Sequence, residues 1–288
     1  MYKKNILKKL VLTVAASSTL CVASFVQAQN LAQIEKKGVM TVATEDNYSP
    51  FNYIEKGEPQ GINRDLLDEL RRYSKFEVKQ EILPWTGLLA SVSGGQYDLA
   101  LTGAIITDAR LNTFDFTPPI ASAQHYFVTR AKDDSIKTID DLDGKTVGLQ
   151  AGSALLERLP ELKAMLENDG KKLGKVVQYQ SYPEAYADLA NGRVDYVINS
   201  VVSVNEIVKA KPNVFKKGLA VSGPGFVSWP VPKNNPELLN YLTGFFLHLK
   251  ETGRLAQLQK KWFGESFDQL PDQAITSVEQ YKQLTAVK

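Results

Sequence analysis

Arg110 is the residue whose position most clearly suggests a binding chemistry. It follows a buried-type strand expected at 97–102 and a polar turn, and it falls in the first turn of a short helix that Thr107 can cap. A cation at that end of a helix is unfavourable unless an anion lies nearby, because the helix dipole is positive there. A guanidinium can hold a carboxylate through two parallel hydrogen bonds. The segment therefore indicates a carboxylate site, with a surface ion pair to Asp108 or Asp115 as the alternative.

Short turns of polar or small residues follow the ends of five expected strands, including the strand before Arg110. Open parallel sheets bind ligands where strands end and helices begin, and helix N-termini favour anionic groups. Three of the turns belong to a first α/β unit and two to a second, so a cleft between the units would be lined by both. Such a cleft suits a small carboxylate or zwitterionic ligand. The five turns are residues 44–48, 85–86, 102–104, 152–153 and 199–200.

Alternating strands and helices position these turns. A first set of strands and helices runs to about residue 129, and after a charged patch at 132–134 the pattern restarts as a second, smaller set. Two more helices, starting at Pro236 and near residue 254, close the chain. The spacing predicts an α/β protein with mostly parallel sheets. Strands are expected at 40–43, 76–82, 97–102, 146–150, 176–179 and 194–198, and helices at 63–73, 85–93, 138–142, 154–166, 182–190 and 199–208.

The charge balance argues against nucleic acid as a partner. The 288-residue chain has 34 basic and 32 acidic residues and a net charge of +2. Four lysines and no acidic residue lie within residues 1–28, so the remainder carries 30 basic and 32 acidic side chains. A near-neutral protein lacks the excess positive charge that nucleic-acid binding uses. The sequence also shows no Ser-His-Asp motif and no metal-ligand cluster, and neither a metal nor a cofactor is expected.

Residues 1–28 have the features of a secretory signal peptide. A lysine-rich start, an apolar run over 6–26 and Val-Gln-Ala at 26–28 match the three parts of such a signal. The alternative is an uncleaved membrane anchor, but hydroxyl residues at 17–19 interrupt the run, which is short for a span. Cys21 could carry a lipid, although Leu20 is not the small residue that lipid attachment requires. We expect an exported, soluble, periplasmic product.

Nine short segments, in order over 38–264, resemble the periplasmic amino-acid-binding proteins of ABC importers, the family-3 extracellular solute-binding proteins. One such segment would be weak, but nine in the right order form a specific pattern. They are Tyr-Ser-Pro-Phe at 48–51, Gly-Ile-Asn-Arg-Asp-Leu at 61–66, Trp-Thr-Gly-Leu at 85–88, Gln-Tyr-Asp at 96–98, Ile-Thr-Asp-Ala-Arg at 106–110, Asp-Phe at 115–116, Leu-Asp-Gly-Lys-Thr-Val-Gly at 142–148, Ala-Asn-Gly-Arg-Val-Asp at 190–195 and Lys-Trp-Phe-Gly at 261–264.

The resemblance implies a two-lobed periplasmic binding protein fold of type II, with two mixed or parallel sheets joined by two hinge strands. The first lobe would comprise residues 29–126 and 229–288, and the second residues 130–224. It also implies a small zwitterionic or carboxylate ligand, a membrane-embedded ABC permease as partner, and a monomer that captures its ligand by hinge closure.

The same resemblance assigns roles to residues in the expected turns. Arg110 would bind the ligand carboxylate with help from Ser153, and Tyr48 and Trp85 would enclose the ligand's side chain. Glu45 matches an acidic position that meets a basic ligand group in some members. The expected ligand-binding set is Glu45, Tyr48, Trp85, Thr102, Gly103, Ala104, Arg110, Ser153, Ala154 and Asn199.

Three departures from the family pattern put an ordinary amino-acid ligand in doubt. Ile105 and Ala154 stand where hydroxyl residues are frequent, and Asn199 replaces the aspartate that pairs with the ligand's α-ammonium group. A neutral amide is a weaker partner for an ammonium than a carboxylate is. The combination of Glu45, Trp85 and Asn199 resembles the opine-binding branch, which favours an N-substituted or amine-lacking carboxylate; an ordinary amino acid remains open because Glu45 or Asp46 could take the ammonium.

An enzyme on the same fold is the main rival interpretation. Cyclohexadienyl-dehydratase-like proteins need an acid or base in the cleft, and Glu45 or Glu157 would have to supply it. The two histidines are far apart in sequence: His248 falls on an amphipathic helix and is expected to be structural, whereas His125 precedes the expected hinge and could line the cleft. Binding without catalysis is the preferred reading.

Overall fold

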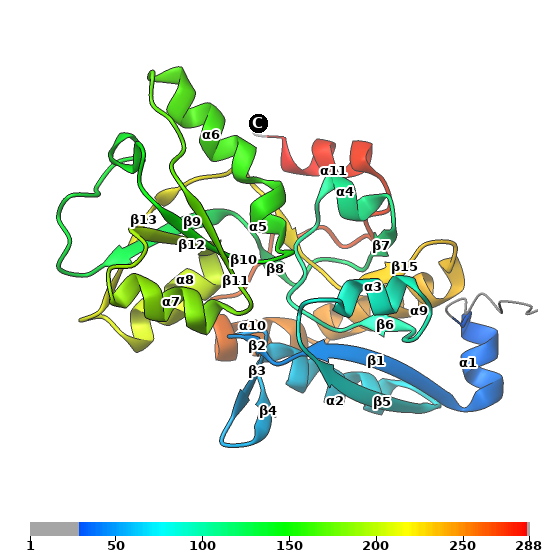
Figure 1. The fold of residues 1–288 in the computed structure, drawn as a ribbon. Coiled ribbons are helices and arrows are strands. Elements are labelled where there is room, and N and C mark those ends of the chain that lie inside the picture. Colours follow the sequence, from blue (N-terminus) through cyan, green and yellow to red (C-terminus); the bar gives the residue numbers. More distant parts are fainter. Residues whose placement is uncertain (1–28, 287–288) are drawn as a thin grey trace, which may run out of the picture.

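The computed structural model describes residues 29–286 and has two α/β lobes (Figure 1). In the view of Figure 1, a five-stranded sheet with its helices lies on the left and a three-stranded sheet lies at the lower right. The two-lobed α/β architecture expected from the sequence is confirmed. The signal peptide expected over residues 1–28 lies outside the described residues.

The first lobe is built on three parallel strands with β1 in the centre. Helix α2 connects β1 to β5 and buries Ile62, Leu66, Leu67 and Leu70 completely, because these residues recur on one helical face. Since the strands are parallel, the residues that follow them meet at one edge of the sheet. The elements are α1 (Leu31–Lys37), β1 (Val39–Glu45), α2 (Ile62–Tyr73), β5 (Glu77–Leu83), α3 (Leu88–Ser93) and β6 (Leu99–Ala100), with an antiparallel meander of β2 (Asn47–Tyr48), β3 (Asn52–Glu55) and β4 (Glu58–Gln60) after β1.

The second lobe contains a mixed five-stranded sheet of order β11-β10-β12-β9-β13, in which β10 pairs in parallel with β11 and β12, and β9 runs antiparallel to β12 and β13. The helix expected over 154–166 is divided in two, because Pro160 lacks the N–H needed in a helix interior and instead starts a new helix. The elements are β9 (His125–Arg130), η1 (Asp140–Leu142), β10 (Val147–Gln150), α5 (Ala154–Glu157), α6 (Leu159–Asn168), β11 (Val176–Tyr179), α7 (Tyr182–Ala190), β12 (Tyr196–Ser200), α8 (Val201–Ala210) and β13 (Phe215–Ala220).

Two chain crossings connect the lobes and run antiparallel to each other. Strand β8 (Ala121–Ser122) pairs with β14 (Phe226–Val227), and on the first-lobe side β7 (Phe114–Phe116) pairs with β15 (Pro230–Pro232). Strand β9 pairs with the second sheet from His125 onward. The lobe boundaries at 126–130 and 224–229 stay a prediction, and the paired crossings lie within a few residues of them.

The C-terminal part of the chain returns to the first lobe. Helix α9 (Pro236–Glu251) is separated from α10 (Arg254–Phe263) by Gly253, whose φ of 70° suits glycine. A further helix that the sequence analysis does not predict, α11 (Val278–Thr285), reaches α4 (Asp108–Leu111), where Lys282 lies 3.0 Å from Asp108. Figure 1 shows α11 in red beside α4.

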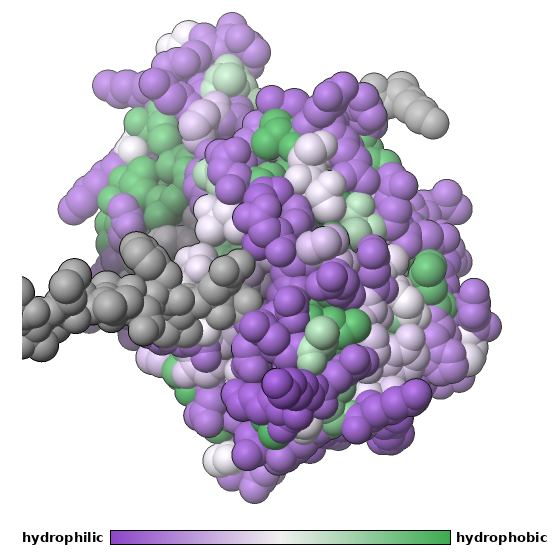
Figure 2. All heavy atoms as spheres, turned by 90° about the vertical axis from the view of Figure 1, so that its right-hand side faces the viewer, coloured by the Kyte–Doolittle hydropathy of each residue, from purple (hydrophilic) through white to green (hydrophobic). Residues whose placement is uncertain are grey.

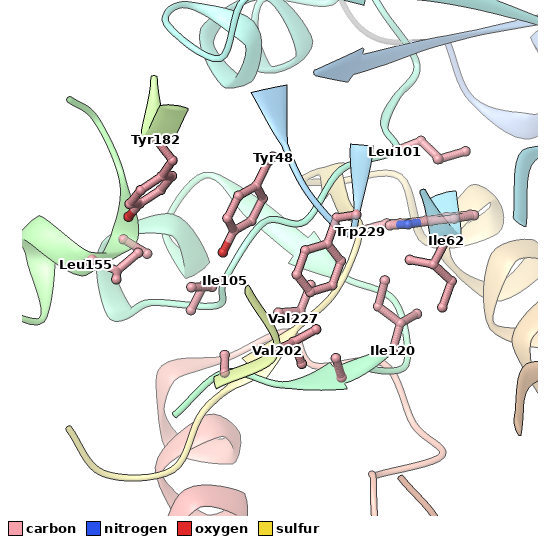
Figure 3. Close-up of a cluster of buried hydrophobic side chains, with 14 of the residues drawn as sticks. Tyr48, Ile62, Leu101, Ile105, Ile120, Leu155, Tyr182, Val202, Val227 and Trp229 are labelled. Atoms are coloured by element: carbon pink, nitrogen blue, oxygen red, sulfur yellow. The ribbon is translucent and has the colours of Figure 1, made fainter. Parts of the chain in front are cut away.

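Aromatic and aliphatic side chains fill the interior. Trp229 is fully buried and donates its indole N–H to Asn63 Oδ1 at 2.8 Å, so a polar atom in the core has its partner. Figure 3 shows this cluster extending from Trp229 to Tyr48 and Tyr182, which stand side by side between the lobes. The face shown in Figure 2 is largely hydrophilic, with its hydrophobic residues in separate groups.

Candidate functional site

A small cavity lies where the strand ends of the two lobes meet. Its volume is about 20 Å³, which is room for one water molecule rather than for an amino acid. Hydrogen bonds between the lobes surround the cavity, so the lobes are in a closed arrangement that must widen to hold a larger ligand. The cavity is lined by Glu45, Tyr48, Trp85, Gly103, Ala104, Ile105, Arg110, Gln150, Ser153, Ala154, Leu155 and Tyr182. Eight of the ten residues expected from the sequence are among them, and Thr102 and Asn199 are not.

Arg110 lies on the short helix α4 and points into the interior, with 7 % of its surface exposed. The Thr107 side chain caps this helix by accepting the Arg110 backbone N–H at 3.2 Å, as expected. The guanidinium donates from Nη1 to the Ile105 carbonyl at 2.9 Å and from Nη2 to the Gly152 carbonyl of the second lobe at 3.2 Å. These bonds fix the orientation of the guanidinium and use two of its five N–H groups.

The charged group paired most closely with Arg110 comes from the second lobe. Its Nε lies 3.6 Å from Glu157 Oε1, and Glu157 also accepts a hydrogen bond from Thr107. Burial lowers the pKa of the guanidinium, and the Glu157 charge opposes that change. The surface-pair alternative is wrong, because Asp108 pairs with Lys282 and Asp115 with Lys233. Arg110 is thus a buried cation between the lobes.

Glu45 ends strand β1 and is 4 % exposed. Its Oε1 accepts the backbone N–H of Gly103 at 3.2 Å, across the edge of the sheet. Burial raises the pKa of the carboxyl from 4.5 to about 8, against the opposing effects of this hydrogen bond and of the Arg110 charge. Around neutral pH, Glu45 in the closed arrangement is mostly protonated, so it can donate a hydrogen bond as well as accept one.

Two aromatic rings border the cavity on the first-lobe side. The Trp85 ring centroid lies 5.2 Å from Arg110 Cζ, within cation–π range, so the indole faces the guanidinium. Tyr48 stacks on Tyr182 of the second lobe with ring centroids 5.7 Å apart (Figure 3). Together with Ile105 and Leu155 these rings keep the surroundings of Arg110 apolar. A charge pair formed there is stronger than in water.

The Tyr48 hydroxyl connects the lobes. It lies 3.2 Å from Asn199 Oδ1 and 3.2 Å from Ser200 Oγ, and burial raises its pKa to about 12, so it stays neutral. The Asn199 amide also accepts the Ser200 backbone N–H at 2.8 Å and donates to the Tyr186 hydroxyl at 3.1 Å. Asn199 therefore lies behind Tyr48, on the side away from the small cavity.

Ser153 and Tyr182 bring two unpaired hydroxyl groups to the cavity. They are 5 % and 3 % exposed, and within residues 29–286 neither hydroxyl makes a hydrogen bond of good geometry, although Ser153 lies close enough to Tyr182 to oppose the rise that burial causes in the Tyr182 pKa. A buried hydroxyl without a hydrogen-bond partner costs free energy unless a ligand or a water molecule supplies the hydrogen bond. Thr102 is different: its Oγ1 accepts the Ala104 backbone N–H at 3.0 Å and shapes the turn.

Further hydrogen bonds cross between the lobes around the cavity. Ser203 Oγ donates to the Ser49 carbonyl at 3.1 Å, and Thr86 Oγ1 donates to Gln180 Oε1 at 3.2 Å. With the bonds of Arg110 to Gly152 and of Tyr48 to the end of β12, they hold the closed arrangement.

Three lining residues were missed by the sequence analysis. Tyr182 opens helix α7 directly after strand β11, the same strand-to-helix position that identified the other turns, so the same rule could have found it. Gln150 is the last residue of β10, two positions before a turn that was recognised. Leu155 follows Ala154 inside a helix, and nothing in its type or spacing distinguishes it from a core leucine.

His125, which could have lined the cleft, does not. It is 2 % exposed, and burial together with the nearby Arg158 charge lowers its pKa well below the usual value. Among the described residues there is no group of three or more His, Cys, Asp or Glu side chains arranged to hold a metal ion. No helix within 29–286 has the length and apolar character needed to cross a membrane.

Two α/β lobes with a buried arginine, a carboxyl group and aromatic rings between them define a two-lobed small-molecule-binding protein. The chain belongs to the bacterial extracellular solute-binding proteins, family 3, whose sequence profile matches residues 40–265. This confirms the family that the nine segments indicate.

Known proteins similar to the chain are binding proteins. The L-cystine-binding protein TcyJ of Escherichia coli K12 is 28% identical over 88% of this chain and 93% of its own length. The ABC transporter arginine-binding protein 1 of the same organism is 28% identical over 75% of this chain and 87% of its own length. The structure of an ancestral arginine-binding protein bound to arginine has a TM-score of 0.70 and 28% identity, covering 79% of this chain and 99% of that one. These comparisons support the expectation that the chain is a binding protein rather than an enzyme.

Proposed function

We propose that this protein is the periplasmic binding component of an ABC importer and captures an amino acid or amino-acid derivative by closure of its two lobes. The observation that carries the proposal is Arg110, a buried guanidinium held between the lobes by bonds to both of them. A carboxylate is the ligand group that such a fork matches best. The relatives named for L-cystine and for arginine support the same ligand class.

The remaining cavity residues suit the other parts of such a ligand. Glu45 is the partner for a basic group, because a cation beside it would lower its raised pKa and ionise it. The Ser153 and Tyr182 hydroxyls supply unused hydrogen-bonding groups, and Trp85 supplies an apolar face. The proposal also includes export through a cleaved signal peptide at 1–28, a monomeric state and docking on a membrane permease. Its first lobe comprises 29–126 and 229–288, and its second lobe comprises 130–224.

The ligand's amino group is where we expect a departure from ordinary amino acids. Asn199 is an amide rather than a carboxylate, and it lies behind Tyr48, bonded to Tyr48, Tyr186 and Ser200, so it gives the cavity no counter-charge. Burying a free α-ammonium group without a counter-charge is costly. We therefore propose that N-substituted or amine-lacking carboxylates bind more tightly than common amino acids, unless the ammonium reaches Glu45.

Ligand binding by Arg110→Lys tests the proposed function. A thermal-shift screen of arginine, cystine, octopine, betaine and simple carboxylates should first find a stabilising ligand, because binding to the folded state alone raises its stability. Calorimetry should then show a loss of about 2 kcal/mol in Arg110→Lys, since lysine keeps the charge but loses the fork. Arg193→Lys is the matched control, because the Arg193 side chain is 68% exposed and forms a surface ion pair with Asp188. Unchanged affinity in Arg110→Lys would contradict the assignment of Arg110. A screen in which none of the compounds stabilises the protein would contradict the proposed ligand class.

A further inference from the structure

A groove of about 470 Å³ lies next to the small cavity and is separated from it by Tyr48 and Tyr182, which line both. The groove runs between α7 and α8, with the buried rings of Tyr186 and Phe215 at its base. Figure 1 shows these two helices side by side at the lower left. Its volume is within the range of small-molecule sites, whereas the cavity at Arg110 holds about 20 Å³.

The groove is apolar along its walls and has one acidic group. The walls are formed by Pro183, Ala187 and Ala190 of α7 and by Ile207 and Val214 on the opposite side. Glu206 is the only acidic residue among those lining it, and burial raises the pKa of this carboxyl group, as expected for a carboxylate with incomplete solvation. No Glu206 ion pair is formed among residues 29–286.

One basic residue, Lys211, also lines the groove. It is exposed and caps the C-terminus of α8, and its charge partly offsets the effect of burial on Glu206 without forming an ion pair within 4.0 Å. A solvated lysine at the outer end leaves the half-buried carboxylate as the dominant charge inside. The lining as a whole therefore favours a cation with an apolar body over an anion or a neutral molecule.

Both lobes form the groove. Asn47, Tyr48 and Ser49 come from the first lobe, and the other lining residues come from the second. The rim is joined by the bond from Ser203 Oγ to the Ser49 carbonyl at 3.1 Å and by the contact of the Tyr48 hydroxyl with Asn199. The groove in this form exists only when the lobes are closed, so an occupant gains contacts with the first lobe that it lacks in the open arrangement.

We propose that this groove is a second binding site, which takes a primary amine on a short apolar chain. The ammonium group lies against Glu206 and the chain lies along Ala187 and Ile207. Because the site is complete only in the closed arrangement, its occupant stabilises closure and thereby changes the affinity of the Arg110 site. By thermodynamic reciprocity, a ligand at Arg110 changes the affinity of the amine by the same factor.

Hexylamine, hexanol and hexanoate at constant ionic strength are the probes, because they share the apolar chain and differ in the charge of the head group. Calorimetry should show hexylamine binding at least tenfold more tightly than hexanol, and hexanoate binding most weakly. Backbone amide chemical shifts should change in 182–190 and 203–215. Equal affinities for hexylamine and hexanol would overturn the proposal, because Glu206 would then contribute nothing.

Variants distinguish this site from the cavity at Arg110. Glu206→Gln should weaken hexylamine at least tenfold, and Lys211→Met should strengthen it severalfold. Glu184→Gln is the matched control, because Glu184 is an exposed α7 residue outside the groove. Ala187→Leu should block binding by filling the groove while remaining compatible with a helix. Binding that is unchanged in both Glu206→Gln and Ala187→Leu would place the amine elsewhere and overturn the proposal.

The proposed coupling has its own measurement. In Arg110→Ala, hexylamine should still bind and should still reduce the radius of gyration in small-angle scattering, because the amine closes the lobes from its own site. Loss of hexylamine binding in Arg110→Ala, with binding retained in Glu206→Gln, would mean that the amine occupies the cavity instead. An unchanged radius at saturating hexylamine would overturn the coupling.

Discussion

Glu45 should make the closing of the two lobes depend on pH. The side chain is 4 % exposed in the closed arrangement, where burial raises its pKa from 4.5 to about 8. Separation of the lobes would return the carboxyl group to water and its pKa towards 4.5. A group that binds its proton more tightly in the closed arrangement favours closure when it is protonated. Closure is therefore fully favoured below pH 4.5 and is progressively lost as the pH rises to about 8.

The size of the effect follows from the two pKa values. The difference between 4.5 and about 8 corresponds to about 5 kcal/mol, at 1.36 kcal/mol for each tenfold change. This is the largest cost that ionisation of Glu45 can impose on the closed arrangement. The lobes can avoid this cost by opening, which returns the carboxyl group to water. The pKa observed for Glu45 in the ligand-free protein is therefore limited by the free energy of opening. We expect a shift from mostly closed at pH 5 to mostly open at pH 9 without ligand.

Small-angle scattering of ligand-free protein from pH 5 to pH 9 measures this shift. The radius of gyration should rise with pH for the wild type and stay constant for Glu45→Gln, whose amide is neutral throughout and can still accept the Gly103 N–H. Glu58→Gln is the control, because Glu58 is exposed at the start of β4 and should follow the wild type. Parallel pH curves for wild type and Glu45→Gln would refute the reasoning.

Three further substitutions have defined outcomes. Tyr48→Phe keeps the ring but loses the hydroxyl contacts with Asn199 and Ser200, so calorimetry should show ligand affinity reduced by about 1 kcal/mol. An affinity equal to that of the wild type would exclude a role of the Tyr48 hydroxyl in closure. Asn199→Asp should leave the preference between octopine and arginine unchanged, because Asn199 lies behind Tyr48 and does not line the cavity; a shift towards arginine would contradict this placement. Gly61→Ala should lower the free energy of unfolding by about 1–3 kcal/mol, because φ is 110° at Gly61 and a Cβ there would overlap the Phe51 carbonyl. A denaturant titration measures this loss, and an unchanged midpoint would contradict the prediction.

The position of the site could be predicted because parallel strands end at one edge of a sheet. Glu45 ends β1 and Gly103 follows β6, so the topology of the first sheet alone brings these two together, and Ser153 follows β10 at the corresponding edge of the second sheet. An anionic partner for Arg110 was expected from its place near a helix N-terminus, where a cation is unfavourable without one. The sequence did not identify Glu157 as the anion beside it, because that contact forms between lobes.

Side-chain direction could not be predicted at the ends of short strands. Thr102 was expected in the cleft, but its hydroxyl turns back to the Ala104 N–H, a local hydrogen bond that threonine can form in many turns. Asn199 was expected directly after a buried strand, but it lies within β12 and behind Tyr48. Which side of an aromatic ring an amide occupies depends on how closely the lobes approach, and no pattern within either lobe contains that information.

The position of Tyr48 connects the small cavity, the groove and the closing motion. Its ring separates the cavity at Arg110 from the groove at Glu206, and its hydroxyl reaches the end of β12 in the other lobe. Opening of the lobes must break these hydroxyl contacts and the stacking on Tyr182, which are made only in the closed arrangement. A ligand on either side of the ring therefore acts on the same equilibrium. Since the two proposed sites share this wall without sharing a charged group, a change at Arg110 or at Glu206 should remove one ligand while leaving the closing response to the other intact.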